Sequence, residues 1–133
     1  MTSPLRALYP ETATLADGWL DAGRCGGYEI VPLLSADDFL REAKAMDNCL
    51  DRYADKLRDG GVRVFSIRLD GRAVADLEIS THAQEAGMPA ITQLRTARNR
   101  RASPELWQVA LSWLGSQPVR KPPAGLALGT SQK

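Results

Sequence analysis

The sequence is poor in the residues that build disulfide frameworks and metal sites. Its 133 residues hold two cysteines, Cys25 and Cys49, and a single histidine, His82. No Cys-x-x-Cys pair is present, so a zinc site is not expected. We therefore expect no metal and no other cofactor.

The chain also lacks long apolar runs and an excess of charge. No apolar stretch approaches the length of a membrane span, and the N-terminus lacks the basic-then-apolar order of a signal peptide. These absences predict a cytoplasmic protein without a membrane partner, in which Cys25 and Cys49 are reduced thiols. The formal net charge of +1 argues against nucleic-acid binding through overall charge, but leaves a local basic patch open.

Composition and length favour one globular domain with loose ends. Residues 1–27 are an N-terminal extension with a short predicted helix that passes Trp19 and ends at Gly23. Residues 28–116 form the domain itself. Residues 117–133 are rich in Pro, Gly, Ala, Ser and Lys without periodicity, which predicts a disordered tail.

The clearest element is a long helix that begins after Ser35 and ends at Gly60. Ser35 is a favoured N-cap, and Asp38 three residues later resembles a capping box. Apolar residues then recur at alternating steps of four and three, which is one buried stripe of a helix. They are Phe39, Ala43, Met46, Leu50, Tyr53 and Leu57. Cys49 falls on or beside this stripe.

A β-hairpin is predicted from two strands, 62–69 and 72–80, joined by Asp70-Gly71, a strong type I′ turn signal. A regular two-residue turn places Phe65 opposite Asp76 and Arg63 opposite Glu78. An Arg63–Glu78 cross-strand pair follows from that register.

Two further strands complete the predicted sheet. Residues 28–31 follow a glycine-rich loop as a short strand, and residues 90–95 follow a loop at 82–89. Residues 96–102 are predicted to be a basic loop.

A closing helix starts at Ser103-Pro104, with the serine as cap and the proline at the first helical position. It stops near Gly115, and its inner stripe consists of Leu106, Val109, Ala110 and Trp113. The fold class is therefore α+β: a long helix, a three- to four-stranded antiparallel sheet and a closing helix, with both helices on one face.

A set of polar residues along these elements resembles the PcfJ-like family, named after a protein of conjugative plasmids and widespread in bacteria and their mobile elements. The likeness covers roughly residues 28–115. It lies in Asn48-Cys49-Leu50 with Tyr53, in Glu78 at the end of the second hairpin strand, and in Gln93-Leu94-Arg95 with Asn99. Thr96 stands where the family pattern has glycine. The family has no settled activity, so the resemblance implies a fold and a bacterial or mobile-element context, not a reaction.

Cys49 is the candidate nucleophile, and a thiolate needs a base or positive surroundings. His82 is the candidate base, with Glu78, Gln93 and Asn99 as supporting groups. This arrangement predicts a cysteine-dependent hydrolase or transferase. The alternative is that Cys49 is a small buried residue of the helix stripe.

Asn48, Glu78, Gln93 and Asn99 suit hydrogen bonds to a planar amide or base if the strands bring them together. The alternative is a buried polar network that is satisfied within the protein. A metal-dependent nuclease would need two or three clustered acids. Only Asp76 and Glu78 are close in sequence, so this class is disfavoured.

One dense basic run points to a polyanion. It consists of Arg95, Arg98, Arg100 and Arg101, with Arg120 and Lys121 in the tail. Arginine suits phosphate, and Trp107 on the closing helix offers a stacking face. The alternative is a solvated loop.

The leading hypothesis is therefore a nucleic-acid-binding or nucleic-acid-processing accessory module that holds DNA or RNA through the loop 95–101. A third hypothesis is a protein-interaction or inhibitor module of a mobile element. Trp107 and Trp113 are six residues apart, so they cannot both lie on one buried stripe, and one of them is predicted to be partly exposed. That tryptophan faces either a protein partner or a domain that longer relatives carry.

Overall fold

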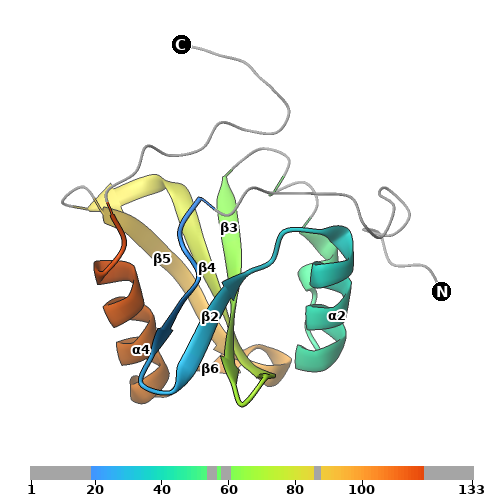
Figure 1. Ribbon diagram of the computed structural model, residues 1–133. Coiled ribbons are helices and arrows are strands. Elements are labelled where there is room, and N and C mark those ends of the chain that lie inside the picture. The colour runs from blue at the N-terminus through green and yellow to red at the C-terminus, as the bar shows by residue number, and fades with distance from the viewer. Residues whose placement is uncertain (1–18, 54–56, 58–60, 86–87, 119–133) are drawn as a thin grey trace, which may run out of the picture.

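The computed structural model describes residues 19–53, 57, 61–85 and 88–118. In this part of the chain, six antiparallel strands form one sheet in the order β1-β2-β3-β4-β5-β6, so each strand pairs with the next along the sequence. Helix α4 covers one face of the sheet and helix α2 lies on the other (Figure 1). The strands are β1 (Gly23–Cys25), β2 (Tyr28–Pro32), β3 (Val62–Leu69), β4 (Arg72–Glu85), β5 (Met88–Thr96) and β6 (Arg100–Arg101), the helices are α2 (Ala36–Met46) and α4 (Pro104–Gly115), and two 3₁₀ turns are η1 (Leu50–Arg52) and η2 (Ala97–Asn99).

The α+β class is confirmed, but the sheet has more strands than predicted and the helices lie on opposite faces rather than on one. The predicted loop at 82–89 is wrong, because β4 extends to Glu85 and pairs with β5 down to Met88. The basic loop contains η2 and the short edge strand β6. No helix in the described part of the chain combines the length and the apolar character that a membrane crossing requires.

The N-terminal glycines form a hairpin instead of a loop. Gly26 and Gly27 have φ of +58° and +86°, which fits a two-residue turn between β1 and β2, with Cys25 paired to Tyr28. The predicted helix through Trp19 is wrong where it can be compared, since Trp19 is not helical. Its earlier part lies outside the described residues.

Helix α2 begins as predicted and ends early. The capping box of Ser35 and Asp38 is present, with both reciprocal hydrogen bonds. Asp47 then takes a left-handed conformation with φ of +52°, and the side chain of Asn48 accepts the backbone N–H of Leu50 at 3.1 Å. Because such an Asn side chain competes with helical hydrogen bonding, the chain leaves the helix here. The predicted end at Gly60 lies outside the described residues.

A bulge in the central hairpin decides which residues face which helix. Leu69 pairs with Arg72 as predicted, but the register shifts at Ile67 and Arg68, with one extra residue on β4. Phe65 therefore faces Leu77 and not Asp76, and Arg63 faces Ile79. The predicted Arg63–Glu78 cross-strand pair is wrong for this reason.

The shifted register separates an apolar face from a polar one. The face under α4 carries fully buried side chains from both hairpin strands, namely Phe65, Ile67, Ala75, Leu77 and Ile79. The face under α2 carries Val64, Ser66, Asp76 and Glu78. Without the bulge, two carboxylates would lie in the main core, where burial of a charge is strongly unfavourable.

Helix α4 matches the prediction at both ends, with Ser103 as its N-cap, Pro104 as its first residue and Gly115 as its last. The ring of Trp113 packs against Phe65 with centroids 4.8 Å apart, and its indole N–H donates to the carbonyl of Asp21. Trp113 is only 2% exposed, so it does not present an interface. Trp107 is 37% exposed and is the partly exposed tryptophan that the spacing predicts.

Candidate functional site

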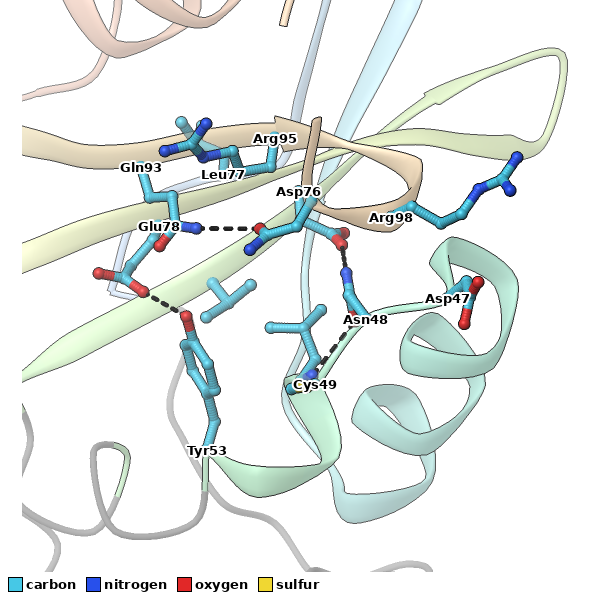
Figure 2. A pocket seen from close by; sticks show the side chains of 13 residues that line it. Asp47, Asn48, Cys49, Tyr53, Asp76, Leu77, Glu78, Gln93, Arg95 and Arg98 are labelled. Atoms are coloured by element: carbon cyan, nitrogen blue, oxygen red, sulfur yellow. Dashed lines mark hydrogen bonds between the residues drawn. The ribbon is translucent and has the colours of Figure 1, made fainter. Parts of the chain in front are cut away.

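An open pocket of about 270 Å³ lies between the chain that follows α2 and the surface of β4 and β5 (Figure 2). It collects most of the predicted site residues: Asn48, Cys49, Glu78, Gln93, Arg95, Arg98 and Asn99. Tyr53 of the same motif also lines it, together with Asp47, Leu50, Val64, Asp76 and Leu77. The pocket is therefore built from segments that are distant in sequence. The sequence pattern had already identified candidate residues in three of these segments.

The left-handed residue Asp47 places the first segment. Because the helix ends there, Asn48 and Cys49 lie on the turn between α2 and η1, not on the helix. Cys49 is exposed, and the interpretation of this thiol as a buried residue of a helix stripe is wrong.

The sheet register places the second segment. Glu78 pairs directly with Gln93, and Asp76 pairs with Arg95, so these four side chains leave the same face of the sheet. The strands thus bring Glu78 and Gln93 together, which is the condition that the hypothesis of a planar ligand required.

The turn after β5 supplies Arg98 and Asn99. Both residues have left-handed φ angles, +58° and +61°, which turns the chain back to β6. The Nε2 of Gln93 donates to Oδ1 of Asn99 at 3.3 Å. This contact leaves the amide nitrogen of Asn99 and the amide oxygen of Gln93 for another partner.

Glu78 is held by two hydroxyl groups. The Tyr53 hydroxyl donates to Glu78 Oε1 and the Thr92 hydroxyl donates to Glu78 Oε2, each at 2.7 Å. The pKa of Tyr53 is raised above its ordinary value, mainly because the side chain is partly buried and secondly because its hydroxyl is hydrogen-bonded to Glu78. Tyr53 therefore remains a protonated donor at neutral pH, and Glu78 remains an oriented acceptor.

Behind the pocket, Asp76 meets a second acid. Asn48 Nδ2 donates to Asp76 Oδ2 at 2.7 Å, and the Glu42 side chain on α2 is a close neighbour of Asp76. The two acids are 4% and 7% exposed. Burial and the neighbouring Glu42 raise the pKa of Asp76 to about 9, against the opposing effects of Asn48 and Arg68.

The four arginines of the basic run, Arg95, Arg98, Arg100 and Arg101, do not all lie on the same face of the sheet. Arg95 and Arg98 line the pocket. Arg101 pairs with Arg95 and shares its face, whereas Arg100 pairs with Thr96 on the other face. None of the four forms an ion pair with a carboxylate of the described residues. The side chain of His82 lies outside the described residues, and its backbone is part of β4.

Sequence reasoning missed Glu42 and gave Asp76 no part in the site. Glu42 follows Phe39 by three residues and precedes Met46 by four, so it occupies a stripe position, where a charged residue is unusual. That was the available signal. Asp76 could not be assigned to this face without the bulge. Within the described ranges, no three His, Cys, Asp or Glu side chains gather in a way that could hold a metal ion.

No family model matches the chain, and no curated protein or solved structure matches it either. The resemblance to the PcfJ-like family therefore stays a prediction from the motif residues, and functional argument proceeds from the pocket.

Proposed function

We propose that this chain is a nucleic-acid-binding module and that the pocket receives one nucleotide of the bound strand. The observation that carries the proposal is the presence of Arg95 and Arg98, neither of which has an ion-pair partner among the described residues, on the same pocket as the Asn48, Gln93 and Asn99 side chains. Planar guanidinium groups recognise phosphate. Amide side chains recognise the edges of bases, because each carries a donor and an acceptor.

The size of the pocket supports a small ligand or one unit of a polymer. Its volume of about 270 Å³ lies just below the range of about 300–1,000 Å³ that is typical of sites for drug-sized molecules. Glu78 already accepts two hydroxyl groups, and Asp76 holds a proton at neutral pH because its pKa is raised. The two acids therefore repel a phosphate less than two free carboxylates would.

The resemblance to the PcfJ-like family agrees with this proposal in context. We propose that the domain belongs to a bacterium or a mobile element, where nucleic acid is handled during transfer. The motif residues of that resemblance are pocket residues in this fold, including Asn48, Glu78 and Gln93.

The direct test is a binding titration with a labelled single-stranded oligonucleotide of about twelve nucleotides, a length within the usual site sizes. Arg98→Ala is expected to weaken binding and to lower its salt dependence. The slope of the logarithm of the binding constant against the logarithm of the salt concentration should become shallower by about 0.7, because one phosphate contact is lost and fewer counterions are released. Arg72→Ala is the matched control, since Arg72 is an exposed arginine at the hairpin turn. Equal binding by wild type and Arg98→Ala, or weak salt dependence, would overturn the proposal.

A second candidate function is favoured by the exposure of Cys49 on the pocket wall. A cysteine-dependent hydrolase or transferase would use this thiol as nucleophile, with Glu78, Gln93 and Asn99 around the substrate and His82 as base. This function predicts rapid alkylation of Cys49 by iodoacetamide near neutral pH. The rate is measured in a Cys25→Ser variant, in which Cys49 is the one thiol that can react. Alkylation at the rate of an ordinary exposed thiol, with no pH step below about 8, would exclude this function.

A further inference from the structure

A second hollow adjoins the pocket. Its volume is about 410 Å³, and Gln93 and Arg95 line both spaces. Arg101 of β6 and Trp107 of α4 also line it. The two hollows therefore meet at Gln93 and Arg95 of β5.

The backbone of Trp107 lies in the first turn of its helix. The side chain of Ser103 caps α4, and the backbone N–H of Trp107 donates to the Ser103 carbonyl. The residue is 37% exposed, so the protein covers most of its surface and leaves a part open toward the hollow that it lines. A partly open indole offers a large aromatic surface on which a base can stack.

Two arginines line the same hollow as this indole. Arg95 and Arg101 pair across β5 and β6, which places both guanidinium groups on one face of the sheet. Neither has an ion-pair partner within the described residues. An aromatic surface beside two cations matches a base with the phosphates that flank it.

We propose that the hollow of Arg95, Arg101 and Trp107 is a base-stacking subsite for the nucleotide next to the one in the pocket. This inference rests on the proposed function, and it names the ligand class as single-stranded nucleic acid. A base inside a duplex is stacked on both sides and does not offer its face to Trp107. The subsite therefore selects an unpaired strand.

The test compares a labelled single strand with a duplex of the same length. Trp107→Ala is expected to weaken single-strand binding by roughly 5- to 140-fold, the range that corresponds to loss of one stacked base. Trp107→Phe keeps a ring and is expected to retain most of the affinity. Quenching of tryptophan fluorescence on titration is expected in wild type and reduced in both variants.

Leu111→Ala is the matched control, because Leu111 is an apolar side chain of α4 that is 55% exposed and does not line the hollow. An equal loss in Leu111→Ala and Trp107→Ala would overturn the subsite in favour of an apolar protein-binding face. Equal affinity for single strand and duplex, or full competition by inorganic polyphosphate, would overturn it in favour of a purely ionic contact.

The two proposals fail in different ways. If wild type binds no oligonucleotide, the proposed function falls and the subsite falls with it. If wild type binds single strands and Arg98→Ala weakens binding while Trp107→Ala does not, the proposed function stands and only the stacking subsite is overturned.

Discussion

Glu42 of α2 and Asp76 of β4 meet as two buried carboxyl groups behind the pocket. Asn48 donates to one oxygen of Asp76, but neither Glu42 Oε2 nor Asp76 Oδ1 has a hydrogen-bond donor among the described residues. A proton shared between the two acids removes this deficit, because a protonated carboxyl group is a donor. The pair then links α2 to the sheet as long as it holds that proton.

The pH dependence of stability follows from this pair. The pKa of Asp76 is higher in the folded protein, at about 9, than its ordinary value of 3.8, so the folded state takes up the proton. The resulting stabilisation is complete below about pH 4 and is lost as the pH rises toward 9. In Asp76→Asn this loss is absent, because the amide donates to Glu42 and still accepts from Asn48 at every pH.

Urea unfolding at about pH 5, 7 and 9 measures this effect. The free energy of unfolding of wild type is expected to fall relative to Asp76→Asn by up to about 1.4 kcal/mol per pH unit. Asp76→Ala is the contrasting variant, because it leaves Glu42 buried without its partner and is expected to be less stable than Asp76→Asn throughout. A difference between wild type and Asp76→Asn that does not change with pH would contradict the shared proton.

The hairpin bulge gives a second prediction. Val74 is the extra residue of β4, between Ala73, which faces Arg68, and Ala75, which faces Ile67. Deleting Val74 removes the extra residue, and a regular ladder then keeps Ala75 opposite Ile67 and Asp76 opposite Ser66. We expect the deletion variant to fold with both faces of the hairpin unchanged and to be destabilised by about 0.5–3 kcal/mol, measured by thermal unfolding with circular dichroism.

The control for the deletion is Val74→Ala, which keeps the register and removes only two methyl groups at a partly buried position. It is expected to cost about 1 kcal/mol. A deletion variant that does not fold, while Val74→Ala folds, would show that the bulge itself is needed to keep Asp76 and Glu78 on the α2 face.

The bulge also explains how far the sequence predicts the fold. The beginnings of the two hairpin strands, the Asp70-Gly71 turn and the closing helix after Ser103 are predictable because short-range rules determine them. The alternation from Val74 to Ile79 is the same in either register, so local pattern cannot assign the faces. One signal was available: the regular register pairs apolar Phe65 with the acid Asp76, whereas a shift of one residue pairs it with apolar Leu77.

The candidate site was predictable in its members and not in its arrangement. The motif positions named Asn48, Glu78 and Gln93, and all three line the pocket. The helix pattern, however, continues through Cys49, because Met46, Leu50 and Tyr53 keep the helical spacing. A single left-handed residue ends the helix, and such a residue leaves almost no periodic signal when it is Asp and not Gly.

That left-handed residue gives a third prediction, in which glycine has opposite effects at two positions of one helix. Asp47 has φ of +52° and ψ of +59°, which glycine adopts without strain, so Asp47→Gly is expected to be neutral or to stabilise by up to about 1 kcal/mol. Ala45 is exposed within α2, and Ala45→Gly is expected to destabilise by about 0.5–1 kcal/mol. Urea unfolding at neutral pH measures both, and a loss in Asp47→Gly equal to that in Ala45→Gly would mean that α2 continues past Asp47.

The last prediction compares two tyrosine–glutamate hydrogen bonds that differ in burial. Tyr53 donates to Glu78 in a part-buried position on the pocket wall, whereas Tyr28 donates to Glu105 at the surface. A hydrogen bond to a charged acceptor contributes more where water is excluded. Tyr53→Phe is therefore expected to lower the free energy of unfolding, measured in urea, by about 1–3 kcal/mol, and Tyr28→Phe by clearly less.

Tyr53→Phe also leaves one oxygen of Glu78 without its hydroxyl donor on the pocket wall. Under the proposed function it should therefore weaken oligonucleotide binding, while Tyr28→Phe should not. Equal stability losses in the two variants, with unchanged binding, would show that Glu78 is not held by the Tyr53 hydroxyl in solution.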